Sequence, residues 1–281
     1  MEDNVNKSNK EILKEGFLKE QVHEEVFEEE DAQEGLTQEE ISFKTKRLID
    51  LVNDGDLRHV QEFLAKEEIG VNVQDEQGIT PLMVAALNGR VRLTEELIAS
   101  KADLNMQDAL GETALMKAIC NGYNRTAQLL IEAKADLDIQ SNKGLTALMR
   151  AVHKGDMDIL GGLLAHGVDL DLQDCYGLTA LMHAVQAGFN DVVLFLIVAG
   201  ADLDKKDITD KTARDWANAY AHVECLRLLD AIQKEKTQSH QFTDGFQNQP
   251  LEETQESLTE PKKIMSSKIL GALEQERTRE E

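Results

Sequence analysis

Features that mark several common protein classes are missing from this sequence. No run of about 18 apolar residues is present, and the first ten residues are polar, so we expect neither a membrane span nor a secretory signal. The three cysteines among 281 residues are too few and too scattered for a disulfide framework. These absences predict a cytoplasmic protein, with the nucleus as an alternative location.

Positive charge is also in short supply. The chain has 30 Lys and Arg against 53 Asp and Glu, a formal net charge of −23. Binding to a phosphate backbone requires clustered basic side chains, so neither nucleic acid nor an anionic membrane is an expected partner. Aromatic residues make up 4% of the chain against 41% hydrophobic residues, which predicts a core of small aliphatic side chains.

The acidic charge is concentrated toward the ends. Residues 1–40 hold 14 acidic and 4 basic side chains, a net charge of −10, and residues 235–281 hold 10 and 6, a net charge of −4. The segment between them therefore carries −9 of the −23. We expect a globular middle between two polyelectrolyte-like tails.

A 33-residue period runs through the middle of the chain. Glycines and threonines recur at this spacing, at Gly78, Gly111, Gly144, Gly177 and at Thr80, Thr113, Thr146, Thr179, Thr212. The surrounding sequence repeats with them: DEQGITPLMVAALNG from Asp75, DALGETALMKAICNG from Asp108, SNKGLTALMRAVHKG from Ser141, DCYGLTALMHAVQAG from Asp174. A period that is kept through five copies indicates a repeat protein.

Each copy predicts a turn followed by two helices. Asp75 and Gly78 have the chemistry of a tight turn, because Asp caps it and Gly accepts a positive φ. Thr80 can then cap a first helix, with Pro81 at the first helical position, where its missing N–H costs nothing. A second helix carries an aliphatic stripe. One such helix pair buries both of its faces only by stacking on its neighbours.

The repeats resemble the ankyrin repeat family, whose signature is a 33-residue unit with a turn, Gly-x-Thr-Pro-Leu, two antiparallel helices and a closing Gly-Ala-Asp. The resemblance covers residues 43 to 234 and implies an all-α solenoid of stacked antiparallel helix pairs joined by β-hairpin-like fingers. We assign the repeat domain to residues 42–236, with caps at 42–74 and 207–236 and internal repeats at 75–107, 108–140, 141–173 and 174–206.

Two columns depart from the family pattern. Methionine replaces the usual His after Pro-Leu, at Met83, Met116, Met149 and Met182. An apolar contact is therefore expected at that seam. Lys101 and Lys134 occupy a column that holds glycine in later repeats, so we expect both in a left-handed conformation that costs about 1–2 kcal/mol.

The two ends of the array are predicted to be caps. Residues 47–55 and 56–66 reproduce a helix pair without the Gly-x-Thr-Pro turn. In the last copy Arg214 and Asp215 replace the Leu-Met pair of the internal repeats. Solvent exposure of a terminal repeat requires such a polar face.

The tails differ from the repeats and from each other. In the acidic tail 1–41, residues 10–31 predict an amphipathic helix that docks on the first cap, binds a partner or masks the binding face. Residues 237–281 are predicted to be largely disordered, with a short helix near 263–275. The acidic end 274–281 also resembles the C-terminal signals of proteins that intracellular bacteria export into host cells.

The sequence offers no candidate for catalysis. It has no His-x-x-x-His or His-Glu-x-x-His pair and no P-loop, so no catalytic, metal or cofactor site is predicted. The tails of 40 and 47 residues are too short to enclose an enzyme. We expect a protein that is not an enzyme.

The ankyrin resemblance implies protein binding on a concave face, made by the finger tips and the exposed side of the first helices. Carried over residue by residue, this face comprises Glu76, Gln77, Ile79, Leu87, Asn88, Leu110, Glu112, Cys120, Lys143, Leu145, His153, Lys154, Tyr176, Leu178, Gln186, Lys206, Lys211 and Tyr220. Its four lysines and two glutamates give +2 in a chain of −23. Apolar anchors with a few cations predict a partner segment that is extended or helical, apolar and mildly acidic.

The predicted function is that of a monomeric, non-catalytic adaptor that binds another protein. Two alternatives stay open: an effector delivered to the host cytosol by an intracellular bacterium, and an inhibitor that masks a transcription factor. Neither tail contains an Asp-Ser-Gly-x-x-Ser degradation signal, which counts against the inhibitor.

Overall fold

The computed structural model describes residues 37–66 and 69–243. These residues form helices and turns with no strand among them, which confirms the all-α prediction. The helices are α2 (Gln38–Asp54), α3 (Leu57–Ala65), α4 (Pro81–Leu87), α5 (Val91–Ala99), α6 (Ala114–Cys120), α7 (Asn124–Glu132), α8 (Ala147–Lys154), α9 (Met157–Ala165), α10 (Ala180–Ala187), α11 (Asn190–Ala199), α12 (Ala213–Ala219) and α13 (Val223–Thr243).

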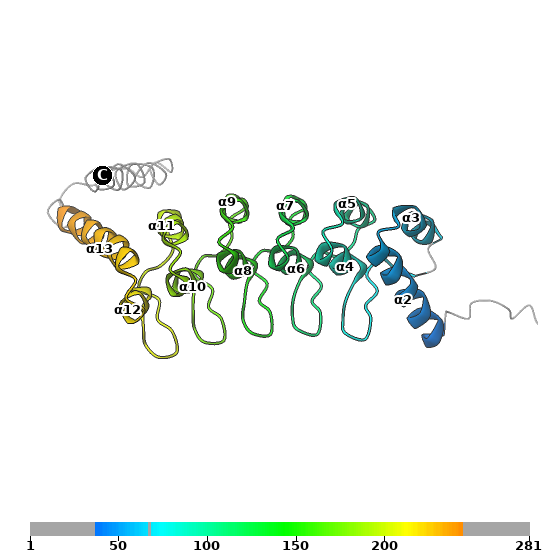
Figure 1. Cartoon of the computed structure of the whole chain (residues 1–281), viewed down its shortest axis with the longest axis horizontal. Helices are drawn as coiled ribbons and strands as arrows, with labels where there is room; N and C mark the ends of the chain where they lie inside the picture. The colour runs from blue at the N-terminus through cyan, green and yellow to red at the C-terminus, as the bar shows by residue number, and fades with distance from the viewer. Residues whose placement is uncertain (1–36, 67–68, 244–281) are drawn as a thin grey trace, which may run out of the picture. The chain divides into compact units, whose positions relative to one another are not determined.

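The chain forms two units, residues 1–43 and 44–281, and the repeats belong to the second. Each repeat contributes a helix pair, from α4 with α5 to α12 with α13. The first helices of neighbouring repeats contact one another, and so do most of the neighbouring second helices. The loops before the first helices extend to one side of this row, and the second helices lie on the other (Figure 1). This stacking confirms the predicted solenoid.

Threonine hydroxyls begin the first helices, as predicted. In all five copies the Thr Oγ1 accepts the backbone N–H of the residue three positions later, at 3.1 to 3.4 Å. Thr80 shows the full arrangement, because Pro81 follows it at the start of α4. The bond satisfies an N–H that the first turn leaves without a helical acceptor.

The second helices of two repeats end in strained backbone. Lys101 and Lys134 have φ of 62° and 66°, which confirms the left-handed exit that their column predicts. Asp210 and Ala221 also have positive φ, at 65° and 55°. Both stand 33 residues after glycines of the same columns, Gly177 and Gly188, so the sequence already held this signal.

Lys101→Gly is expected to raise the free energy of unfolding by about 0.5–1 kcal/mol, because glycine removes the left-handed strain while adding freedom to the unfolded chain. Lys101→Ala keeps the strain and controls for the lost charge. Gly167→Lys is the reverse test and should lower the free energy of unfolding, because it places a lysine at a left-handed position. Gly167 has φ +79° with nothing within 4 Å of an added Cβ, so the strain acts alone. Urea unfolding measures all three variants, and a loss of stability in Lys101→Gly would contradict the assigned strain.

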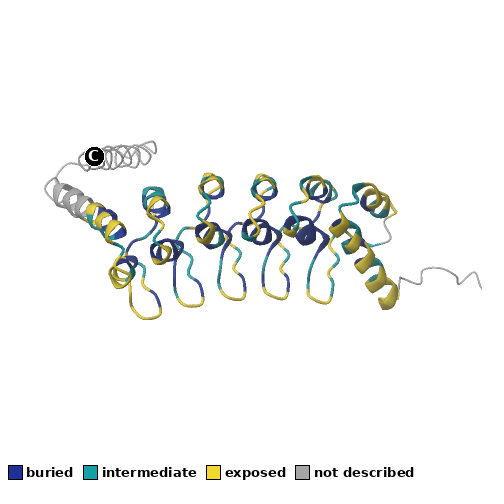
Figure 2. Ribbon diagram, viewed as in Figure 1, coloured by how far each residue is buried: buried dark blue, intermediate teal, exposed yellow. Residues whose placement is uncertain are grey.

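The core runs along the inner surfaces of both helix rows, with exposed residues on the loops and the outer helix surfaces (Figure 2). The methionine column lies within it, because Met83, Met116, Met149 and Met182 are each 1% exposed. The seam that holds a polar residue in other family members is therefore packed by apolar side chains here, as predicted.

Thr126 is a polar residue in an aliphatic column. It is 1% exposed on α7, and its Oγ1 has no hydrogen-bond partner among the residues that the structure describes. Leucine and isoleucine stand at the corresponding positions 93 and 159. The hydroxyl is therefore buried without compensation.

Thr126→Val is expected to raise the free energy of unfolding by about 1 kcal/mol, because the isosteric change removes an unpaired buried hydroxyl. Thr94→Val is the matched control. Thr94 is also fully buried, but its hydroxyl donates to the Arg90 carbonyl at 3.0 Å, so its loss should be neutral or destabilising. Equal effects in the two variants would show that the missing partner is not what distinguishes Thr126.

The ends of the array differ partly from prediction. α2 begins at Gln38, nine residues before the predicted helix start at residue 47. α13 continues to Thr243. The prediction of disorder is therefore wrong for residues 237–243, which extend this helix. Arg214 and Asp215 are exposed, as a cap requires. The helices predicted at 10–31 and 263–275 lie outside the described residues.

Candidate protein-binding face

The loops that precede the first helices form a hydrogen-bonded row. We call them fingers and assign them to residues 74–79, 107–112, 140–145, 173–178 and 206–211. Each finger tip accepts a backbone N–H from the next, for example Asn142 N to Leu110 O at 3.0 Å and Cys175 N to Lys143 O at 3.0 Å. A glutamine ladder adds to this, as when Gln107 Nε2 donates to Gln140 O at 2.9 Å. The finger backbones are thereby held in register.

A carboxylate organises most fingers. One oxygen of Asp108 accepts the backbone N–H groups of Leu110 and Glu112, both at 2.8 Å. The aspartates at positions 75, 174 and 207 make the corresponding pair of bonds. Ser141 stands at this position in the third internal repeat and makes one such bond, to Leu145 N at 3.2 Å.

In three of the four aspartate fingers, the second carboxylate oxygen contacts a side chain on the following first helix, nine residues later. Asp108 Oδ2 accepts from Lys117 Nζ at 2.5 Å. Asp174 Oδ2 contacts His183 Nε2 at 3.0 Å. The third pair joins Asp207 Oδ2 to Trp216 Nε1 at 2.9 Å. These bonds tie the fingers to the first helices.

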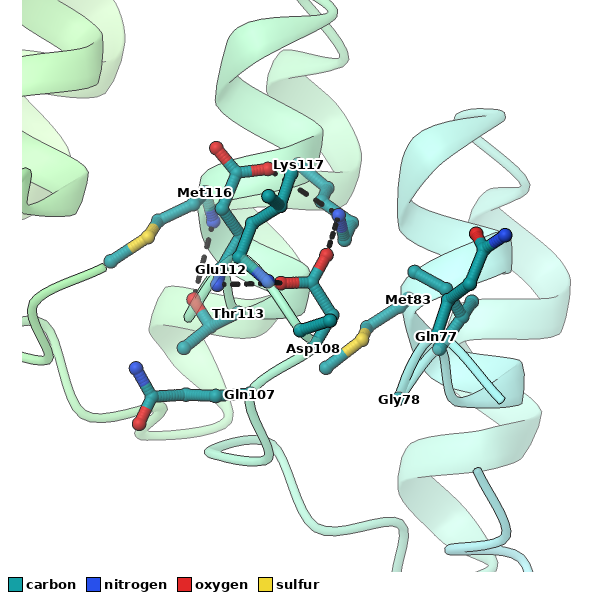
Figure 3. A network of polar contacts seen from close by, with 12 residues as sticks. Gln77, Gly78, Met83, Gln107, Asp108, Glu112, Thr113, Met116 and Lys117 are labelled. Atoms are coloured by element: carbon teal, nitrogen blue, oxygen red, sulfur yellow. Dashed lines mark hydrogen bonds and ion pairs between the residues drawn. The ribbon is translucent and has the colours of Figure 1, made fainter. Parts of the chain in front are cut away.

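A charged cluster lies between the second and third internal repeats. Lys117, whose side chain is 8% exposed, contacts Asp108 and also Glu112 Oε2 at 3.4 Å (Figure 3). Arg150 of the next repeat bonds the other Glu112 oxygen. Burial acts to raise the pKa of Asp108, but the hydrogen bonds from Lys117 and from two backbone amides outweigh it and hold that pKa below its ordinary value.

Two histidines and an aspartate form a chain of contacts beside this cluster. His183, 6% exposed, contacts Asp174 with one ring nitrogen and exposed His153 with the other, at 3.2 Å. Burial lowers the pKa of His183 despite Asp174. The pKa of His153 is lowered first by burial and then by the nearby His183 and Arg150. The negative charge of Asp174 acts in the opposite direction.

Acidification toward pH 5 is expected to destabilise the fold through these histidines. Their pKa values lie below those in the unfolded chain, about 6.5, so the unfolded state binds more protons as the pH falls. The stability that the two neutral histidines contribute is complete above pH 6.5 and is lost as the pH falls below it. Urea unfolding at pH 7.5, 6.5 and 5.5 should show a shallower loss in His153→Gln than in wild type. Parallel pH profiles would count against this linkage.

Most of the predicted site residues are accessible. Glu76, Gln77, Leu87, Leu110, Lys143, His153, Lys154, Tyr176, Gln186, Lys206, Lys211 and Tyr220 are exposed, and Ile79, Asn88, Glu112, Cys120 and Leu145 are partly buried. Leu178 is 8% exposed and packs in the core, so its assignment to the binding face is wrong. Its column holds Ile79 and Leu145, which also pack against the core from beneath the fingers.

Several predicted binding residues already have partners. Lys206 pairs with Asp210 at 2.9 Å, and Lys211 lies over the Trp216 ring at 5.2 Å. The cations Lys117 and Arg150 and the buried His183 are not among the predicted site residues. The sequence held a signal for Lys117 and His183. Four fingers carry an aspartate as their second residue, and in three of them the residue nine positions later has a side chain that can bond its carboxylate: Lys117, His183 and Trp216.

The described residues hold no cluster of His, Cys, Asp and Glu arranged to bind a metal ion. Within the same residues, no helix has both the length and the apolar character that a membrane crossing requires. The three cysteines are free thiols, and burial raises the pKa of Cys120.

Comparisons with known proteins agree with this geometry. The family model for ankyrin repeats matches residues 48–141, 124–207 and 148–239. No curated protein matches the sequence. Similar solved structures include an ankyrin repeat protein that is 30% identical, covering 66% of this chain and 97% of that chain with a TM-score of 0.62.

Two further solved structures are similar. One is a chain in the structure of a predatory endopeptidase from Bdellovibrio bacteriovorus in complex with an immunity protein; that chain is 33% identical over 66% of this chain and 97% of its own length, with a TM-score of 0.59. An ankyrin repeat domain from Acinetobacter baumannii is 26% identical over 66% of this chain and 96% of that chain, with a TM-score of 0.62.

Proposed function

The chain belongs to the ankyrin repeat family, and from this premise we propose that it is a non-catalytic adaptor that binds another protein. Binding takes place on the finger face, which we define as the finger tips together with the exposed side of α4, α6, α8, α10 and α12. The partner contributes an apolar, mildly acidic segment. Repeats of this family are protein-interaction modules, and that coarser role needs no catalytic group.

One observation carries the proposal: large apolar side chains are exposed on a backbone that hydrogen bonds between fingers hold in register. Leu110 and Tyr176 at the finger tips are 65% and 62% exposed, and Tyr220 and Leu87 at the ends of α12 and α4 are 45% and 42% exposed. The bonds between fingers fix the spacing of these side chains before any partner arrives. Such preorganisation lowers the entropy cost of association.

Affinity purification of the full chain from its native cells, followed by mass spectrometry, tests the proposal. Wild type is compared with Leu110→Ser/Tyr176→Ser and with a control, Val223→Ser, whose side chain is 58% exposed at the start of α13. A partner on the finger face is recovered with wild type and the control and lost with the double variant. Equal recovery with all three contradicts the proposed face.

A second candidate is that the partner is an enzyme which this chain restrains. The similar structure of an endopeptidase in complex with an immunity protein, at 33% identity, favours it. The same purification separates the candidates. An enzyme whose activity falls when purified chain is added supports restraint, and a partner with unchanged activity supports an adaptor alone.

A further inference from the structure

Three of the five fingers pair an aspartate with a side chain on the next helix, and the other two, which begin at Gln74 and Gln140, do not. Asp108, Asp174 and Asp207 each bond the residue nine positions later on the next helix. In the third internal repeat the finger residue is Ser141, and the residue nine positions later is Arg150. Arg150 therefore has no carboxylate on the finger of its own repeat.

Arg150 is only partly satisfied within the chain. Its guanidinium bonds Glu112 of the preceding repeat, and Glu112 also contacts Lys117. The Arg150 Nε is buried without a hydrogen-bond partner among the described residues. The side chain is still 24% exposed. A guanidinium has five N–H donors, so one shared carboxylate leaves most of them without a protein acceptor.

The surroundings of Arg150 are basic on the exposed side. His153 and Lys154 lie three and four residues later on α8, on the same helix face, and both are exposed. The nearby carboxylates are engaged elsewhere, since Asp108 bonds Lys117 and Asp174 contacts His183. The exposed side of this cluster is therefore complementary to a negative charge.

We propose that Arg150 and Lys154 form a subsite for one aspartate or glutamate side chain of the bound partner. This rests on the proposed function and names the anchor that sets the register of the partner on the array. The partner carboxylate takes the electrostatic role that the finger aspartate has in neighbouring repeats. Arg and carboxylate form paired hydrogen bonds, which add geometric selection to attraction.

The same geometry places an apolar contact next to the acidic one. Tyr176 belongs to the finger of the following repeat, about 10 Å along the array by the usual spacing of packed helices. An extended segment rises about 3.3 Å per residue. The partner is therefore expected to carry an aromatic or aliphatic residue about three positions from its acidic residue.

Selection from a phage-displayed library of random 12-residue peptides tests the subsite on the full chain. The key variant is Ser141→Asp, which supplies Arg150 with an internal carboxylate and leaves Arg150 and Lys154 in place. Ser141→Asn is the matched control, because its side chain can accept the same turn bonds without the charge. Lys154→Gln removes the exposed cation and tests the subsite independently of the finger.

Wild type and Ser141→Asn should enrich peptides with Asp or Glu at one fixed position. Against one such synthetic peptide, Ser141→Asp should bind about fivefold more weakly and Lys154→Gln about twofold more weakly, as expected for loss of partly exposed ion pairs. Ser141→Asp should also melt at a higher temperature than Ser141→Asn. Should Ser141→Asp not fold, Lys154→Gln still decides.

Two results would overturn the subsite. In the first, peptides bind wild type without acidic enrichment, which leaves the proposed function standing. In the second, acidic peptides bind Ser141→Asp and Lys154→Gln as tightly as wild type. A different result bears on the proposed function itself: peptides that bind Leu110→Ser/Tyr176→Ser undiminished do not use the finger face.

Discussion

Gly144→Ala is expected to lower the free energy of unfolding by about 3 kcal/mol or more. Gly144 has φ +74°, and a Cβ built there would lie 2.7 Å from Asp174 Cα and 2.8 Å from Cys175 N. These are backbone atoms of the next finger, which cannot turn away as a side chain can. The two fingers must separate, which breaks the bond from Cys175 N to Lys143 O.

Gly167→Ala is the matched control for Gly144→Ala. Gly167 has a similar φ of +79°, but nothing lies within 4 Å of an added Cβ. This variant should cost only the strain of a left-handed alanine, about 1 kcal/mol. Chemical denaturation gives both values. Equal losses in the two variants would show that the fingers are not in the close contact described.

Lys117→Met is expected to destabilise the chain by about 3 kcal/mol, because it leaves a buried carboxylate without its cation. The side chains of Lys117 and Asp108 are 8% and 3% exposed, so water cannot replace the lost partner. Adding Asp108→Asn should restore most of the stability, since the amide oxygen keeps the turn bonds without the charge. Urea denaturation measures the single and double variants.

An exposed ion pair provides the control for Lys117. Arg58 and Glu62 on α3 are paired at 3.0 Å, with side chains 84% and 52% exposed. Arg58→Met should change the free energy of unfolding by less than about 0.5 kcal/mol, as is usual for solvated pairs. A loss in Lys117→Met as small as this would mean that the central cluster is not a buried network.

The features that could be predicted from sequence are those set by local chemistry. The Thr80 cap depends on residues within one turn, and the left-handed Lys101 depends on its position in a column of glycines. Because the same pattern recurs every 33 residues, an inference made for one repeat applies to the others. Repeat architecture follows directly, because one helix pair cannot bury its faces alone.

The charged cluster could not be predicted in the same way. The spacing of nine residues places Lys117 beside the carboxylate of Asp108, but it does not show that the lysine side chain is buried, which depends on packing. The contact between Arg150 and Glu112 spans 38 residues and follows from a missing carboxylate at Ser141. Leu178 was assigned to the binding face because the ankyrin resemblance places partner contacts on the fingers, whereas its side chain is 8% exposed and packs in the core.

Site-specific photo-crosslinking in native cells tests whether this chain binds a protein on its finger face. A benzophenone amino acid replaces Tyr176 at a finger tip or, as control, Asp158 on the second helix α9, both exposed positions. We expect a discrete protein adduct from position 176 and none from position 158. An adduct formed only from position 158, or equally from both, would contradict binding on this face.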